Sequence, residues 1–140
     1  NDTRFSFSYI GVNKDKDINF YKNMKNYVNF HGHVEDVYKH LFNSDIGLHF
    51  SSEESGSLVL REMMIAGLPI IAWNVPTINS DLKHQSEYLI EKGNFYDAKK
   101  KLIFLSENLD ERKAIGKKSE KLSKIYSTKD MYNNFLKFIK

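Results

Sequence analysis

Hydrophobic and polar positions along the chain follow two periods, which predict alternating strands and helices. Residues 5–12 alternate aromatic and polar side chains, which is the period of a strand. Residues 34–42 instead place their apolar side chains on one helical face. The same reasoning predicts strands at 27–30, 45–50, 69–73 and 86–90, and helices at 18–25 and 58–66. From about residue 96 we expect three helices, marked in turn by Leu102, Leu105 and Leu109, by Ile115 and Leu122, and by Met131, Phe135 and Phe138.

The order of these elements predicts an α/β fold with a doubly wound parallel sheet. Strands alternate with helices through short connections, and residues 70–73 form a continuous apolar run, typical of a strand buried on both faces. We therefore expect a Rossmann-like, three-layer α/β/α domain with C-terminal helices. Because such sheets bind ligands at the carboxyl ends of their strands, the loops of interest are 11–17, 31–33, 51–56 and 74–80.

Composition narrows the class of protein without identifying it. A chain of 140 residues with 41% hydrophobic and 28% charged residues is typical of one ordinary globular domain. With no cysteine, the chain has no disulfide, thiol nucleophile or cysteine-bound metal, which is compatible with a cytoplasmic location. The net charge of +3 is too small to indicate a nucleic-acid-binding domain. Because the chain does not begin with methionine, we expect it to be part of a longer protein.

The loop before the helix at 58–66 has the residues of an anion site. Gly56 allows the backbone to approach a ligand, and Ser55 or Ser57 can cap the helix. The free amides at a helix start favour a phosphate, helped by the helix dipole by roughly 0.3–1 kcal/mol. Glu62 follows about a turn and a half later, where its carboxylate can accept hydrogen bonds from sugar hydroxyls, and Glu54 lies at the loop mouth.

Four ordered blocks in this region resemble a known enzyme family. Glu54 and Glu62, separated by seven residues and followed by MMIAGLPIIA, resemble the Glu-x7-Glu signature of retaining glycosyltransferases. Upstream, YVNFHG at 27–32 and SDIGLHFS at 44–51 are similar to two strand motifs of glycosyltransferase family 4. The resemblance is to the C-terminal half of its GT-B fold, and it covers about residues 5–90 before continuing as helices.

The resemblance implies a donor-binding domain for a nucleoside-diphosphate sugar, most plainly a UDP-sugar, without a metal or cofactor. It implies that Glu54 lies at the transferred sugar as the catalytic residue and that Glu62 binds the ribose. It further implies that Gly32 lies near the base of the nucleotide. The other donor contacts are expected from Ser55 and from the backbone of the residues that follow it, Gly56, Ser57, Leu58 and Val59.

The same resemblance implies what this chain lacks. The first strand of this half, with its basic loop, and the N-terminal acceptor-binding half have no counterpart in the sequence, so residues 1–140 are expected to be a single donor-binding fragment with little transfer activity of its own. The expected acceptor is a glycan or lipid-linked sugar in polysaccharide biosynthesis. A composition rich in Lys and Asn and poor in Arg is typical of an AT-rich genome, and we therefore expect a bacterial source. The alternatives are a non-catalytic domain that binds a nucleotide or a protein, and a nucleotide-sugar epimerase of the same fold.

Further residues carry open interpretations. The lysines between Lys99 and Lys124 are interspersed with acids, which favours a solvated helix face, but they could also attract an anionic membrane surface. Arg61 is expected to pair with an acid rather than a phosphate. His31 and His33 have metal-like spacing but no evident third ligand. Without a first strand, residues 5–12 are expected to pair directly with 46–50, and 27–30 to form an edge strand; the alternatives are that a segment of another chain fills the space or that 5–12 correspond to a different strand of the sheet.

Overall fold

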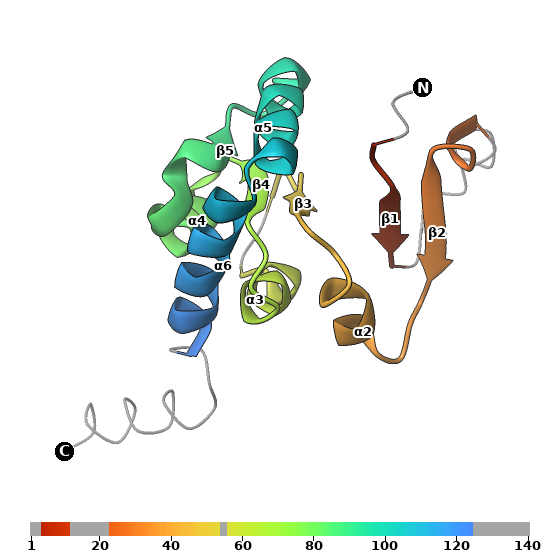
Figure 1. Ribbon diagram of the computed structural model, residues 1–140, viewed down its shortest axis with the longest axis horizontal. Coiled ribbons are helices and arrows are strands. Elements are labelled where there is room, and N and C mark those ends of the chain that lie inside the picture. The colour runs from red at the N-terminus through yellow and green to blue at the C-terminus, as the bar shows by residue number, and fades with distance from the viewer. Residues whose placement is uncertain (1–3, 12–22, 54–55, 125–140) are drawn as a thin grey trace. The chain divides into compact units, whose positions relative to one another are not determined.

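The computed structural model describes residues 4–11, 23–53 and 56–124 (Figure 1). Most of the helix predicted at 18–25 and the last predicted helix lie outside these ranges, as do Glu54 and Ser55. The chain divides into two compact units, residues 1–39 and residues 40–140, and each is described by itself. The prediction of one donor-binding domain over the whole chain stays a prediction.

The first unit contains two of the predicted strands. β1 (Phe7–Ile10) and β2 (Val28–Gly32) pair in parallel, with Phe7 opposite Val28. Tyr9 and Phe30 pack with ring centroids 5.7 Å apart, and the pair ends where the Gly11 N–H donates to the Gly32 carbonyl at 2.8 Å. The parallel arrangement is the one expected. The predicted pairing of 5–12 with 46–50 would join the two units, and it stays a prediction.

Helix α2 (Val37–Leu41) crosses from one unit into the next and is shorter than the helix predicted at 34–42. The Lys39 N–H donates to Asp36 Oδ1 at 3.2 Å, which is the bond of an N-terminal cap. The helix therefore begins after Asp36, and Val34 precedes it.

The second unit is built on a three-stranded parallel sheet. β3 (Gly47–His49), β4 (Ile70–Trp73) and β5 (Leu89–Ile90) lie in the order β3-β4-β5, with β4 in the centre and all four of its residues buried (Figure 1). Around the sheet lie α3 (Leu58–Ile65), α4 (Pro76–Asp81), the 3-10 helix η1 (Lys83–Tyr88), α5 (Phe95–Glu107) and α6 (Leu109–Ser123).

Alternate residues of β4 face two separate cores. Ile71 and Trp73 pack with residues of α5 and α6, such as Leu105 and Ile115. Ile70 and Ala72 pack on the other face with residues of α3 and α4, namely Leu60, Met64 and Ile78. Since successive side chains of a strand point to opposite faces, these two cores place helices on both sides of the sheet. The Rossmann-like α/β/α prediction is confirmed.

Residues 74–80, predicted to be a loop, contain a helix instead. Pro76 is at the start of α4, where its missing N–H leaves no unpaired donor and its fixed φ suits the helix. Ile78 is buried in the core below it. The strand predicted from Ser86 begins only at Leu89, because 83–88 form η1. Pro76 therefore begins a helix rather than interrupting the chain as a loop residue, and Ser86 lies inside η1 rather than at the start of a strand.

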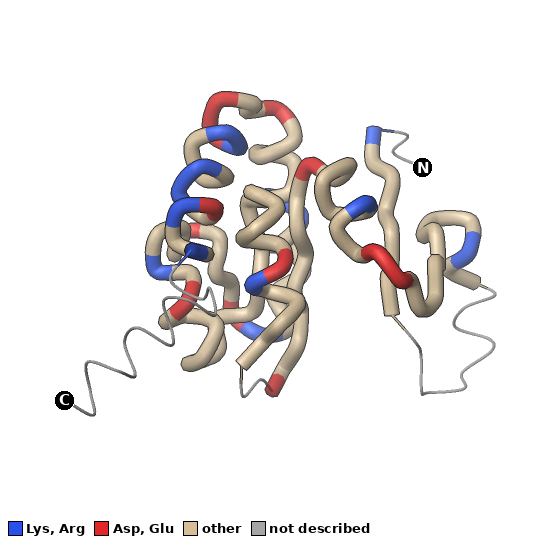
Figure 2. Tube along the Cα trace, turned by 90° about the horizontal axis from the view of Figure 1, so that it is seen from below, with Lys and Arg blue, Asp and Glu red and all other residues tan. Residues whose placement is uncertain are grey.

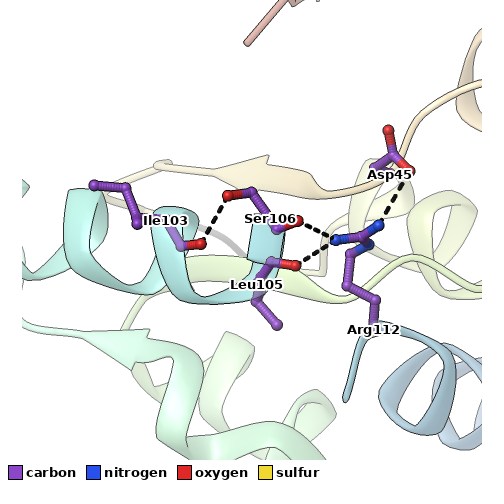
Figure 3. A network of polar contacts seen from close by, with 5 residues as sticks. All are labelled: Asp45, Ile103, Leu105, Ser106 and Arg112. Atoms are coloured by element: carbon purple, nitrogen blue, oxygen red, sulfur yellow. Dashed lines mark hydrogen bonds and ion pairs between the residues drawn. The ribbon is translucent and has the colours of Figure 1, made fainter. Parts of the chain in front are cut away.

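Helices α5 and α6 meet at a turn that the leucine pattern did not predict. Leu109 was assigned to the helix of Leu102 and Leu105, but it begins α6. The Arg112 guanidinium explains the break, since its Nη1 donates to the carbonyl of Ser106 at 2.8 Å and to that of Leu105 (Figure 3). These carbonyls lie in the last turn of α5, where the Leu105 carbonyl also accepts the N–H of the C-cap residue Asn108 at 3.4 Å. Arg112 Nη2 also lies 3.9 Å from Asp45, just before β3.

Candidate functional site

The site is formed by the turn from β3 into α3. Ser57 adopts extended backbone angles (φ −82°, ψ 111°), and its Oγ accepts the Leu60 N–H at 3.1 Å. Of the two serines predicted as possible caps, Ser57 is therefore the cap, and Ser55 lies outside the described residues. No acidic side chain occurs in the first turn of α3, so the remaining free amides and the dipole keep their positive potential.

A second positive group lies at the same helix start. A Cβ placed on Gly56, which has φ +151°, would meet Arg61 Nη2 at 4.0 Å. Because helical side chains lean toward the N-terminus, Arg61 reaches back one turn to Gly56. The sequence signal for this placement is the position of Arg61 four residues after the cap, and the expected pairing of Arg61 with an acid stays a prediction. Gly56 thus lies between free amides and a guanidinium.

Glu62 lies half-buried on the same helix, one residue after Arg61. Leu60 and Met64 fix the orientation of α3 by pointing into the core, while Leu58 and Val59 are exposed. Residues three and four apart share a helical face, so Glu62 lies on the face of Leu58 and Val59, one turn further from the helix start. This is the spacing that a carboxylate needs to reach a group attached to an anion bound at the cap.

The neighbouring strand ends at the same edge of the sheet. Gly47 to His49 pair in register with Ile70 to Ala72, so the loops after β3 and β4 meet there. The Asn74 N–H donates to the Ile90 carbonyl at 2.7 Å, and its side chain accepts a hydrogen bond from Asn79 Nδ2 at 2.7 Å. The predicted grouping of Asn74 with the 51–57 loop is confirmed for the described residues of that loop.

An aromatic cluster lies at this edge as well. The Phe50 ring lies 4.5 Å from that of Trp73, and Trp73 lies 5.2 Å from Phe95, at the start of α5. The sequence did not indicate Phe95, because the helix was expected to begin one residue later. His49 is buried in the strand before Phe50.

The remaining predicted residues lie elsewhere. Gly32 ends β2 with φ +68° and nothing within 4 Å of an added Cβ, but it belongs to the first unit, so its place near the base stays a prediction. Glu54 lies outside the described residues. His31 Nε2 is 3.2 Å from Ser8 Oγ, and among the described residues no three acidic or histidine side chains gather as metal ligands.

Within the described ranges, no helix combines the length and apolarity needed to cross a bilayer.

No curated protein matches the chain. Residues 16–122 match the family described as glycosyl transferases group 1, and this segment includes both α3 and the loops at the sheet edge. The match covers most of the chain, and the chain therefore belongs to the group 1 glycosyl transferases.

Proposed function

We propose that the turn from β3 into α3 binds the diphosphate of a nucleotide-sugar donor for retaining transfer of the sugar. The carrying observation is the capped start of α3, where free amides and the Arg61 guanidinium lie beside Gly56. Both groups favour an anion, and the guanidinium can form paired hydrogen bonds with phosphate oxygens. Family membership supports glycosyl transfer as the chemistry.

The residues around this turn have distinct roles in the proposal. Glu62 accepts the ribose hydroxyls, and the backbone from Gly56 to Val59 contacts the phosphates and sugar. Glu54 serves the transferred sugar. The donor is a UDP-sugar, and the acceptor is a glycan or lipid-linked sugar of bacterial polysaccharide synthesis in the cytoplasm. Arg61 neutralises charge on the diphosphate, and such electrostatic stabilisation of a leaving group amounts to several kcal/mol of the barrier.

Replacing Glu62 with alanine is expected to weaken nucleotide binding by roughly 1–3 kcal/mol, the size of hydrogen bonds to a charged group. The fold should be retained because the residue is half-exposed and the core contacts of α3 come from Leu60 and Met64. Calorimetry with UDP and UDP-sugars measures the affinity. Glu120→Ala, an exposed glutamate of α6, is the matched control and should bind as the unchanged protein does. Equal affinity of the Glu62→Ala variant would remove the ribose assignment.

Nucleotide binding is also expected to be independent of divalent metal. The helix start and Arg61 supply the positive charge beside the diphosphate that a magnesium ion supplies at other sites. UDP affinity should therefore be the same in EDTA and in excess magnesium, measured by the same calorimetry. A loss of binding in EDTA would show that a metal carries the diphosphate.

A further inference from the structure

A triangle of polar side chains, Gln85, His84 and Ser119, lies between η1 and α6. Gln85 is fully buried, and its Oε1 accepts the Ile70 N–H at 2.8 Å. Since a carboxamide has one oxygen and one NH2 group, this bond fixes the orientation of the amide and makes Nε2 its donor on the other side. Nε2 lies 3.2 Å from Ser119 Oγ and 3.1 Å from His84 Nε2. The amide therefore offers an N–H to each of these two atoms.

The Gln85 amide also determines which nitrogen of His84 carries the proton. Its N–H is directed at His84 Nε2, so that nitrogen accepts and carries no hydrogen. The hydroxyl of Ser119, which is fully buried and 2.9 Å from the same nitrogen, donates to it while accepting from Gln85. The ring in this network is thus neutral, with its proton on Nδ1. One lone pair on Nε2 serves donors from both η1 and α6.

Protonation of His84 removes the acceptor on which this network depends. A proton on Nε2 would face the amide N–H of Gln85, and the buried Ser119 hydroxyl would lose its acceptor. A buried donor without an acceptor is unfavourable, and so is a charge placed beside it. We propose that His84 acts as a pH-sensitive switch: when its ring takes up a proton, η1 separates locally from α6 and from the first residue of β4.

The groups around His84 act on balance against its protonation. Burial lowers the pKa of His84 most, and Lys118 of α6, a helix along which lysines recur (Figure 2), lowers it further. Glu87 of η1 and the backbone of Asp81 in α4 raise the pKa with smaller effects. β4 and β5, which also contact η1, contain no charged residue. Because the folded-state pKa is below the usual 6.5, the network is complete above that pH and is lost progressively as the pH falls below it.

The switch lies away from the candidate site and does not rest on the proposed function. Ile70 begins β4, whereas the turn into α3 follows the carboxyl end of the neighbouring strand. In a parallel pair these two ends lie at opposite edges of the sheet. A failure of the switch would therefore leave the assignment of the donor site unchanged, and the reverse also holds.

Hydrogen exchange of the full 140-residue chain between about pH 5.5 and about pH 7.5 measures the separation. The Ile70 amide reports on the network through its bond to Gln85, and the amide of the buried Leu105 in α5 reports on the core. After correction for intrinsic exchange, protection of Ile70 should be constant above about pH 7 and should fall by up to about tenfold for each pH unit below about 6.5. Ile70 should also exchange faster than Leu105, because η1 separates without unfolding of the core.

The His84→Gln variant separates the charge of the ring from its hydrogen bond. A glutamine oxygen can accept at the position of the imidazole Nε2 but does not titrate in this range. Protection of Ile70 should then be nearly independent of pH. His33→Gln, which replaces an exposed histidine of the first unit, is the matched control and should keep the full pH dependence.

Titration of the His84 ring followed by NMR tests the unchanged chain without this variant. The midpoint should lie below the usual 6.5. Ser119→Ala should raise it, because the serine hydroxyl donates only to the neutral ring, and Ser86→Ala at an exposed position should leave it unchanged.

Four results would overturn the switch. The first two are a His84 midpoint at or above 6.5 and protection of Ile70 that does not change with pH in the unchanged chain. The third is equal protection of Ile70 and Leu105 at every pH, which would mean that the whole core opens together. The fourth is a loss of protection at acid pH that persists in His84→Gln, which would assign the pH dependence to another group.

Discussion

Gly116→Ala is expected to lower the free energy of unfolding by roughly 3 kcal/mol, at the upper end of the usual range for overpacking. A Cβ on Gly116 would lie 2.2 Å from the carbonyl oxygen of Gly67 and 3.2 Å from its carbonyl carbon. Both are backbone atoms, so no side-chain rotation can relieve the overlap, and α6 would have to move away from α3. Urea denaturation followed by circular dichroism measures the change.

The direction of this effect is what makes it informative. At an open helix position, replacing glycine with alanine stabilises a protein by up to about 1 kcal/mol. Lys117→Ala, at the next and exposed position of α6, is the control and should change stability by no more than about 0.5 kcal/mol. Unchanged or increased stability of Gly116→Ala would mean that α3 and α6 do not approach each other this closely.

Gln85→Met is expected to destabilise the protein by about 1–3 kcal/mol for each buried polar group that it leaves without a partner. Gln85 is fully buried, and its Oε1 accepts the N–H of Ile70, the first residue of β4, at 2.8 Å. Its Nε2 donates to Ser119 Oγ at 3.2 Å. Methionine has a similar length, but its thioether sulfur is only a weak acceptor for the Ile70 N–H and has no N–H to donate to Ser119, so the loss reports the hydrogen bonds rather than a cavity.

The surrounding network provides the control for this second variant. His84 Nε2 also lies 2.9 Å from Ser119 Oγ, and burial, with Lys118 nearby, lowers the pKa of His84, which favours a neutral ring there. Ser86→Ala, the exposed next residue, should leave the urea midpoint nearly unchanged. If Gln85→Met matched this control, the Ile70 N–H would have to find another acceptor, and the network would not hold η1 to β4.

Elements with a strong local pattern were predicted correctly from the sequence. The apolar run at 70–73 predicted the central strand, since only a strand between two layers needs every side chain apolar. The turn into α3 and a cap at Ser55 or Ser57 followed from local chemistry, because a serine before an apolar helix satisfies a backbone N–H of the first turn, and the structure identifies Ser57 as that cap. Weak patterns failed, as at α4, where Pro76 begins a helix in a segment of loop composition.

The placement of Arg61 was decided by tertiary structure. The sequence shows that Arg61 is charged, but which way its side chain reaches depends on which face of α3 is buried by the sheet. In the same way, α5 carries apolar side chains on more than one face, and only its packing against β4 shows that Ala98 and Leu105 are the buried ones.

The sequence by itself determined the alternation of strands and helices, the presence of a serine cap before α3 and the candidate site loop. These depend on interactions between residues a few positions apart, which a pattern records directly. The contact of Gly116 with Gly67, the bond from Gln85 to Ile70 and the break of the helix at Arg112 were decided only in the folded chain. The first two contacts join separate elements, and the third joins a side chain of α6 to the last carbonyls of α5. The distances between these atoms are set by the packing of the whole core rather than by local sequence.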